Sequence, residues 1–209
     1  MKPMVTNSLK VFPVSTAADL RDLLEAVAAS PPNAAKPTKL DSFLADHPSV
    51  GQALATTATP SSLANEEYHG LNAFILVDKD GKRQAVRYVI APDRVVHLDP
   101  KDAAARAADF LMSELPERLK GGPVTFHLKA QLAAPGDPTN DPSKAWPEDR
   151  RLVDLGTIAI DRAVADSAGT EKQLLYLPGQ ITDGIELSDD PMVLVRNEAY
   201  AVSFARRVP

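Results

Sequence analysis

The sequence predicts an α+β fold in which an antiparallel sheet is either half of a β-barrel or is covered by helices. The spacing of apolar residues is helical before Glu67 and alternating after it, and the second pattern is typical of strands. The strand-like segments follow one another along the chain, which favours antiparallel pairing. With 209 residues, the chain is long enough for one large domain or two small ones.

Helices are predicted in the first part of the chain. Residues 1–10 have no helical pattern, and we expect them to be extended. A helix is predicted over Ala17–Ala29, capped by the preceding serine or threonine, followed by Lys39–Asp46 and a short third helix from Pro48. The apolar residues on the inner face of the first helix are Leu20, Leu23, Leu24 and Val27.

A β-hairpin is predicted around the turn dipeptide Asp80-Gly81. The alternating segments Asn72–Val77 and Gln84–Ile90 flank it, and an Asp-Gly pair supplies the backbone conformation that tight hairpins need. Two further strands are predicted over 123–131 and 152–161. We therefore expect a sheet of four strands.

Two more helices complete the predicted fold. One runs over Pro100–Leu119, is capped by Asp99 and ends at Gly121-Gly122. Its expected inward residues are Ala103, Ala107, Phe110, Leu111 and Leu115. The last helix, Met192–Phe204, follows a start signal of serine, two acids and proline at Ser188–Pro191, with the proline expected at the first helical position.

The composition excludes several classes of function. The formal net charge is −5 with no block of basic residues, so neither nucleic acid nor a membrane surface is an expected partner. The chain has no cysteine, which excludes disulfides, thiolate haem ligation and thiolate zinc sites. No apolar run reaches the ~18 residues of a membrane span. No export signal is visible, so the location is open: cytoplasmic as the chain stands, periplasmic if a signal precedes it.

The four histidines do not have the spacing of a zinc-binding helix motif. His127 alternates with apolar residues in a predicted strand, which favours a core or barrel-lining position over catalysis. His47 precedes a proline and is expected to cap a helix or lie on the surface, and His69 precedes a strand and could line a cavity. Neither a nucleophile elbow nor a glycine-rich phosphate loop is present.

The terminal helix carries the most informative pair of residues. Arg196 and Tyr200 are four residues apart, so their side chains meet on one helix face. A guanidinium held against a phenol favours the phenolate, and tyrosine is a known axial ligand of haem iron. The same spacing also fits a half-buried tyrosine stacked with an arginine on an amphipathic helix, so both interpretations remain open.

Several segments, in the same order, resemble the catalase family, and most closely its short members, the catalase-related haem peroxidases. Arg196 and Tyr200 match the arginine and tyrosine of the proximal haem helix, and Arg207 matches a later arginine of that helix. Residues 141–147 resemble the signature Asp-x-(Ser/Thr)-Lys-x-Trp-Pro, and Asn7 followed by Phe-Pro-Val resembles the distal asparagine segment. Three further segments are similar to the family: Leu40–Pro48, Val153–Ile160 and Gln173–Ser188.

The resemblance implies a cofactor, partners and roles for four residues. The cofactor would be haem b with Fe(III), with Tyr200 as the metal ligand, Arg196 as its charge partner and Arg207 in contact with a haem propionate. Asn7 would be the catalytic residue that donates a hydrogen bond to peroxide. The implied partners are hydrogen peroxide and an organic electron donor, and the resemblance leaves room for a homo-oligomer.

The resemblance also implies a missing part. In the family the distal histidine, the acid–base catalyst, lies well before the distal asparagine, on a segment that forms the first half of an eight-stranded barrel. Met1 stands six residues before Asn7, so we expect residues 1–209 to form a single catalase-like haem domain that is N-terminally incomplete. Leu20 falls near a phenylalanine that the family packs against haem, and Asn72 near a histidine of the larger catalases.

Two functions remain open at this point. The first is a catalase-related haem peroxidase, a hydrogen-peroxide-dependent oxidoreductase with a tyrosinate-ligated haem. Without a distal histidine its turnover would be low, because loss of a general acid–base group costs ~10²–10⁴ in rate. The alternative is a non-catalytic truncated catalase homologue that binds haem weakly or not at all.

Overall fold

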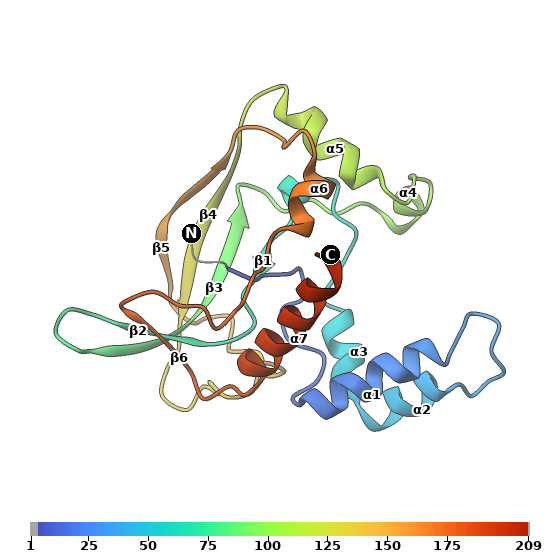
Figure 1. Cartoon of the computed structure of the whole chain (residues 1–209), viewed down its shortest axis with the longest axis horizontal. Coiled ribbons are helices and arrows are strands. Elements are labelled where there is room, and N and C mark those ends of the chain that lie inside the picture. Colours follow the sequence, from blue (N-terminus) through green and yellow to red (C-terminus); the bar gives the residue numbers. More distant parts are fainter. Residues whose placement is uncertain (1–3, 209) are drawn as a thin grey trace.

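The computed structural model describes residues 4–208, and within them one antiparallel sheet has its helices mainly on one side (Figure 1). The strands are β1 (Tyr68–His69), β2 (Phe74–Val77), β3 (Arg83–Pro92), β4 (Val124–Leu132), β5 (Leu152–Ile160) and β6 (Ile185–Leu187). The α-helices are α1 (Ala17–Ala28), α2 (Lys39–Asp46), α3 (Pro48–Leu54), α4 (Pro100–Ala104), α5 (Phe110–Leu119), α6 (Ser167–Lys172) and α7 (Met192–Arg207), with a 3₁₀ turn at Leu63–Asn65. The predicted α+β class and antiparallel pairing are confirmed. No α-helix among residues 4–208 is long and apolar enough to cross a membrane.

The sheet has the strand order β5-β4-β3-β2-β6, and β1 also pairs with β3. The predicted hairpin is confirmed, because β2 and β3 pair directly with Phe74 opposite Val86. The long strands β3 and β4 form the middle of the sheet, and their side chains build a core around Val86, Tyr88 and Ala130. Within the described residues the end strands β5 and β6 do not pair with each other, so the sheet is open and not a closed barrel.

Two strands are missing from the sequence prediction, which expects four where the described sheet has six. β1 has two residues and β6 has three, which is too short for an alternating pattern to stand out. Gly184 immediately precedes β6, and its φ of +80° suits the turn that leads into the strand. Both short strands gain their partners only through the tertiary fold, because β6 pairs with a strand more than a hundred residues earlier in the chain.

The three N-terminal helices form a compact group beside the sheet (Figure 1). α1 begins after Thr16, whose Oγ1 accepts the N–H of Asp19 at 3.1 Å, so the predicted cap is confirmed. Leu23 packs with Val14 and Val50, but Leu24 and Val27 are exposed, so the predicted apolar stripe is too wide. The physical reason is that α1 packs mainly against α2 and only through the part of its apolar face around Leu20 and Leu23.

The predicted single helix over residues 100–119 is wrong. The structure has two helices, α4 and α5, separated by residues 105–109, and the predicted inward residue Ala107 is exposed. α4 has no buried residue, whereas α5 packs Leu115 and Leu119 against Ala64 and Phe126. The alanine-rich first half offers too little apolar surface to be held in line with the second half.

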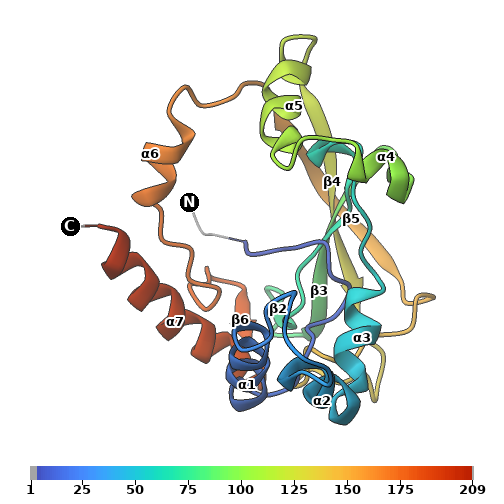
Figure 2. The ribbon, with the colours of Figure 1, turned by 90° about the vertical axis from the view of Figure 1, so that its right-hand side faces the viewer.

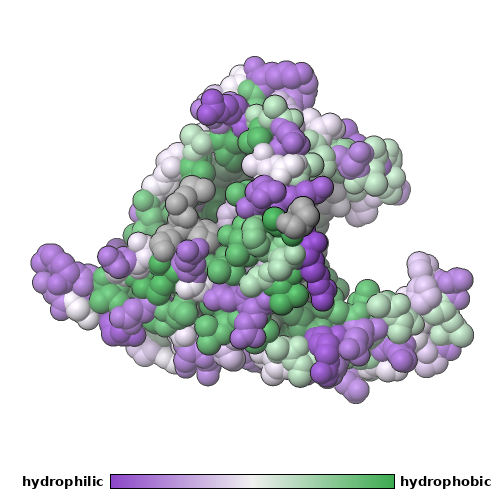
Figure 3. All heavy atoms as spheres, in the orientation of Figure 1, coloured by the Kyte–Doolittle hydropathy of each residue, from purple (hydrophilic) through white to green (hydrophobic). Residues whose placement is uncertain are grey.

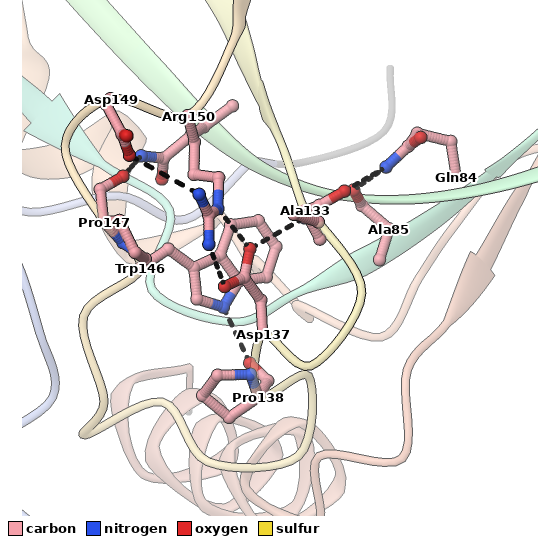
Figure 4. Close-up of polar contacts among 11 residues, drawn as sticks. Gln84, Ala85, Ala133, Asp137, Pro138, Trp146, Pro147, Asp149 and Arg150 are labelled. Atoms are coloured by element: carbon pink, nitrogen blue, oxygen red, sulfur yellow. Dashed lines mark hydrogen bonds and ion pairs between the residues drawn. The ribbon is translucent and has the colours of Figure 1, made fainter.

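The long loop between β4 and β5, residues 133–151, is ordered by its own side chains (Figure 4). We call it the Trp146 loop. The Trp146 ring is buried, and its Nε1–H donates to the carbonyl of Pro138 at 2.8 Å. Arg150 donates from Nε and Nη2 to the two carboxylate oxygens of Asp137 at 2.7 and 3.0 Å. These hydrogen bonds and that ion pair hold the family-like motif of residues 141–147 in place.

The N-terminal segment runs in extended form between the sheet on one side and α6 and α7 on the other (Figure 2). Asn7 forms an isolated antiparallel bridge with His69, with N···O distances of 3.1 and 2.7 Å in the two directions. The predicted extended start is thus confirmed from Met4 onward, and residues 1–3 lie outside the described part of the chain. This arrangement leaves the segment facing α7, where the candidate site lies.

Candidate functional site

α7 is anchored at its N-terminal end and exposed along much of its length. The carboxylate of Asp190 accepts the N–H of Met192 at 2.9 Å and so satisfies one of the free donors at the helix start. The side chains of Met192 and Val193 are almost fully buried. The helix begins at Met192, so Pro191 precedes the helix instead of being its first residue as predicted. A firm first turn therefore positions the residues that follow.

A buried polar network joins α7 to the start of β2. Asn72 donates from Nδ2 to the Asp190 carboxylate at 2.6 Å and accepts at Oδ1 from Arg196 Nη1 at 2.7 Å. Arg196 in turn donates to the phenol oxygen of Tyr200, from Nη2 at 2.8 Å and from Nε at 3.3 Å. We call Asp190, Asn72, Arg196 and Tyr200 the Tyr200 cluster.

The Tyr200 cluster holds one negative and one positive side chain away from water. Asp190 is 3% exposed, Asn72 3% and Arg196 9%. The two charges do not touch, because the neutral amide of Asn72 lies between them as donor to one and acceptor from the other. A guanidinium is planar, so fixing Nη1 on Asn72 also fixes the direction of Nε and Nη2 toward Tyr200. The predicted pairing of Arg196 with Tyr200 is therefore observed as two hydrogen bonds.

The main cavity of the molecule opens beside this cluster and measures about 540 Å³. Tyr200, Ser203 and Arg207 line it from α7, one helical turn apart. The extended segment 4–6 lines it from the opposite side, and the remaining lining residues are Glu171, Leu174, Leu175 and Tyr176. In Figure 3 hydrophobic side chains gather over the middle of this face, with hydrophilic ones among them and at the periphery. The volume falls within the range of small-molecule sites in proteins.

Arg207 lies at the far end of the lining helix, on the same side of α7 as Tyr200. Its Nη2 donates to the carbonyl of Leu174 at 3.3 Å, and its guanidinium lies 5.9 Å from the centre of the Phe204 ring. The side chain is exposed, so it can exchange this carbonyl for a charged group of a ligand at low cost. The structure thus brings three of the four predicted site residues, Arg196, Tyr200 and Arg207, to one helix.

The fourth predicted residue, Asn7, is not among the residues that line the main cavity within residues 4–208. Its Oδ1 accepts the N–H of Leu9 at 2.8 Å, which forms a local turn. Its backbone is fixed by the bridge to His69. The neighbouring residues 4–6 line the cavity in its place, so Asn7 lies beside the site and its amide oxygen is used locally.

The histidines lie outside the main cavity. His47 ends α2, where its Nδ1 lies 3.0 Å from the Phe43 carbonyl, so the predicted capping role is confirmed. Of the two positions predicted for His127, core or barrel-lining, the core position is wrong: its side chain is 40% exposed, between Asp93 and Asp154. His69 lines a separate cavity of about 290 Å³, as expected, and burial lowers its pKa against the opposing effect of Glu67.

Two members of the Tyr200 cluster are missing from the predicted site. The sequence presents Asp190 as a helix cap and Asn72 as the counterpart of a family histidine, and 118 positions separate them. Spacing carries no information about a contact at that separation. Acidic caps do gather at helix starts, however, so a buried cap facing a polar strand residue is the signal that could have identified the pair.

Three comparisons identify what the chain is similar to. A family model described as Catalase matches residues 3–208. The "Catalase-related peroxidase" of Mycolicibacterium paratuberculosis is 36% identical over 198 residues, which is 92% of this chain and 62% of that protein. The protein of the same description from Synechococcus elongatus is 33% identical over 175 residues, which is 82% of this chain and 52% of that protein. The chain therefore spans between about half and three fifths of the length of these relatives.

A solved structure shares the fold. It is the crystal structure of a fungal catalase, with a TM-score of 0.85 and 18% sequence identity, and the match covers 98% of this chain and 45% of that one. At this level of identity the match establishes the architecture alone.

Proposed function

The chain belongs to the catalase family, and we propose that it is a catalase-related haem peroxidase that holds haem b through the phenol oxygen of Tyr200. One observation carries the proposal. The phenol oxygen is fixed by two N–H groups of Arg196, and Tyr200 lines a cavity of about 540 Å³. Tyrosine ligation of haem is the arrangement used by catalase.

The residues around the cavity fit a haem. Met4 and Val5 face Tyr200 across the cavity, and they offer an apolar surface to a flat macrocycle. Both contacts from Arg196 use the phenol oxygen as an acceptor, which would favour the phenolate that an iron ligand requires. Arg207 lies at the end of the same lining face and would contact a propionate through a charge-assisted hydrogen bond.

A bound haem would supply an iron centre that hydrogen peroxide oxidises and an organic donor reduces. The net reaction consumes one hydrogen peroxide and two one-electron donors, each of which gives up a hydrogen atom, and yields two waters. Arg196 orients Tyr200 for iron, and Asn72 orients Arg196. The charge of Asp190 balances that of Arg196 through the intervening amide, which keeps the guanidinium in its buried position.

Asn7 would act on the peroxide side of the haem. Because its Oδ1 accepts from the Leu9 N–H, its Nδ2 is the group with protons to offer to a peroxide oxygen. Its backbone is held by the bridge to His69. This positioning supports Asn7 as a hydrogen-bond donor to peroxide.

A second candidate function is a non-catalytic catalase homologue that binds haem weakly or not at all. The observation that favours it is the position of Asn7, which is not among the described residues lining the main cavity. If Asn7 does not reach the peroxide position, the chain holds a haem without the group that promotes O–O cleavage.

The two functions are separated by reconstituting the purified chain with haem. We expect a tyrosinate-type absorption spectrum, and Tyr200→Phe should weaken haem affinity by more than about 100-fold, because even second-shell changes cost ~10–100-fold. Tyr176→Phe is the matched control, since Tyr176 lines the same cavity and should change affinity little. An unchanged spectrum in Tyr200→Phe overturns the proposal. A haem complex that leaves hydrogen peroxide unconsumed selects the non-catalytic homologue.

A further inference from the structure

A second cavity lies behind the Tyr200 cluster and measures about 200 Å³. It shares the wall formed by Met4 and Val5 with the main cavity. Its wall on the sheet side includes Asn72, the residue that holds Arg196. The remaining lining residues are Gly70, Phe74, Tyr88, Pro178, Gln180, Ile181, Thr182 and Ile185. The proposed function uses none of this space.

The interior of this cavity is lined by aromatic and aliphatic side chains. The rings of Phe74 and Tyr88 lie 5.9 Å apart at an interplanar angle of 42°, which presents a tilted aromatic surface. Gly70 packs closely against Tyr88, since a Cβ there would come within 3.4 Å of the Tyr88 Cβ and carbonyl oxygen. The amide of Asn72 is occupied on both sides by Asp190 and Arg196, so it contributes surface and no available hydrogen bond.

Apart from the amide of Asn72 and the phenol of Tyr88, the polar side chains of this cavity lie at its edge. Gln180 and Thr182 are exposed, on the loop that leads from Pro178 to β6. An amide and a hydroxyl at that position can each accept or donate a hydrogen bond. The cavity therefore combines an apolar interior with a polar rim, and this combination selects a ligand that is apolar at one end and carries a small polar group at the other.

The size of the cavity limits the ligand. An engineered apolar cavity of ~150 Å³ binds benzene, so about 200 Å³ accommodates a single aromatic ring with a substituent. We propose that this cavity binds a one-ring phenol, with the ring between Phe74, Tyr88 and Ile181 and the hydroxyl at Gln180 and Thr182. As the organic electron donor of the site, an assignment that rests on the proposed function, each phenol would lose one electron and its hydroxyl proton, two phenols for each hydrogen peroxide reduced to two waters.

The test measures binding of phenol to the haem-free protein by calorimetry, which requires no enzyme activity. Ile181→Trp fills the cavity and should weaken phenol binding by at least about tenfold, whereas haem uptake stays unchanged. Tyr200→Phe should give the opposite result, with phenol binding retained and haem binding lost. Failure of the inference and failure of the proposed function are therefore distinguishable.

The ligand class is tested separately with the exposed rim. Thr182→Val and Gln180→Leu together should weaken phenol binding severalfold and leave toluene binding unchanged. The reason is that phenol has a hydroxyl that hydrogen-bonds to these two side chains, whereas toluene has none. These exposed substitutions also serve if Ile181→Trp fails to fold. Equal phenol affinity in the wild-type chain and the cavity variants overturns the proposal, and so does wild-type binding of toluene as tight as that of phenol.

Discussion

Two clusters in this molecule each pair an aspartate with an arginine, and they end differently. In the Trp146 loop the pair is direct: Arg150 donates two hydrogen bonds to the Asp137 carboxylate, and the Trp146 indole donates to a backbone carbonyl (Figure 4). In the Tyr200 cluster an amide separates the charges, and the chain of hydrogen bonds ends on a phenol beside a cavity. A network that closes on its own backbone holds a fold together. One that ends at a cavity wall leaves a functional atom for a ligand.

This difference indicates a structural role for the family-like motif of residues 141–147. Arg87 from β3 donates to the carbonyls of Lys144 and Asp141, and its guanidinium lies 4.6 Å from the centre of the Trp146 ring. Burial lowers the pKa of Arg87 to about 10, so it remains a cation at neutral pH. These contacts fasten the loop onto the sheet. The motif that most clearly resembles the family therefore carries structure, and the less distinctive Arg-Tyr spacing carries the candidate chemistry.

The largest expected effect comes from breaking the Tyr200 cluster at its centre. Arg196→Met removes three hydrogen bonds and leaves the buried Oδ1 of Asn72 without its donor. A hydrogen bond from a charged donor contributes about 1.5–3 kcal/mol, so the loss should appear in the free energy of unfolding by urea. Haem affinity should fall with it, because Tyr200 loses both contacts that orient its oxygen.

The matched control is Arg206→Met, which changes an exposed arginine of the same helix. It should shift the free energy of unfolding by no more than about 0.5 kcal/mol. If both variants lose the same unfolding free energy, any arginine substitution in α7 destabilises the protein to that extent, and the Tyr200 cluster makes no particular contribution to stability.

A smaller loss is expected from Trp146→Phe in the other cluster. The change removes the hydrogen bond to the Pro138 carbonyl and part of a buried ring, at a cost of about 1–3 kcal/mol in unfolding free energy. Haem affinity should stay within about threefold of the wild-type value, because a cluster that closes on its own backbone does not reach the main cavity. A matching loss of haem affinity would show that the two clusters are coupled and would remove the distinction between them.

The sequence predicts the elements of this fold well where the signal is local. The cap of α1, the hairpin around Asp80-Gly81 and strands β4 and β5 all follow from patterns within about ten residues. The prediction fails where tertiary contacts determine whether a helix or strand forms. The Pro100–Leu119 segment breaks because its alanines cannot pack, and β6 exists only because β2 lies beside it. In the site, Arg196 and Tyr200 are predictable as helix neighbours, whereas Asn72 joins them only through the fold.

A still smaller loss is expected from Asn7→Ala, which changes the residue next to the wall formed by residues 4–6. The variant loses one hydrogen bond, to the Leu9 N–H, and should cost about 0.5–1.5 kcal/mol in unfolding free energy. Haem affinity should stay within about threefold, because Asn7 is not among the described residues that line the cavity. Peroxide consumption by the haem complex should fall about 10²-fold if Asn7 donates to peroxide. Unchanged consumption would separate Asn7 from the chemistry.

The smallest effect is a local one, set by pH in the Trp146 loop. Hydrogen bonds from Arg150 and from the Ala134 N–H, together with the charge of Arg150, hold the pKa of Asp137 below its usual range near ~3.9. A carboxyl with a lowered pKa in the folded state adds stability at pH values above ~3.9, and this stability is lost as the pH falls through the folded value. Fluorescence of Trp146, the one tryptophan of the chain, should therefore stay constant from pH 7 to about pH 4 and change below it.

Arg150→Met should move this fluorescence transition to higher pH, because the carboxylate loses its cation and two of its donors. Asp149→Asn is the matched control, since Asp149 touches Arg150 only through Nη1 at 3.4 Å and is exposed. A transition at the same pH in Arg150→Met and in the wild-type chain would mean that Asp137 does not govern the loop. The Trp146 loop would then be held in place by the Trp146 indole and by Arg87. In that case the Trp146 loop would differ from the Tyr200 cluster in side-chain packing and not in its charge pairing.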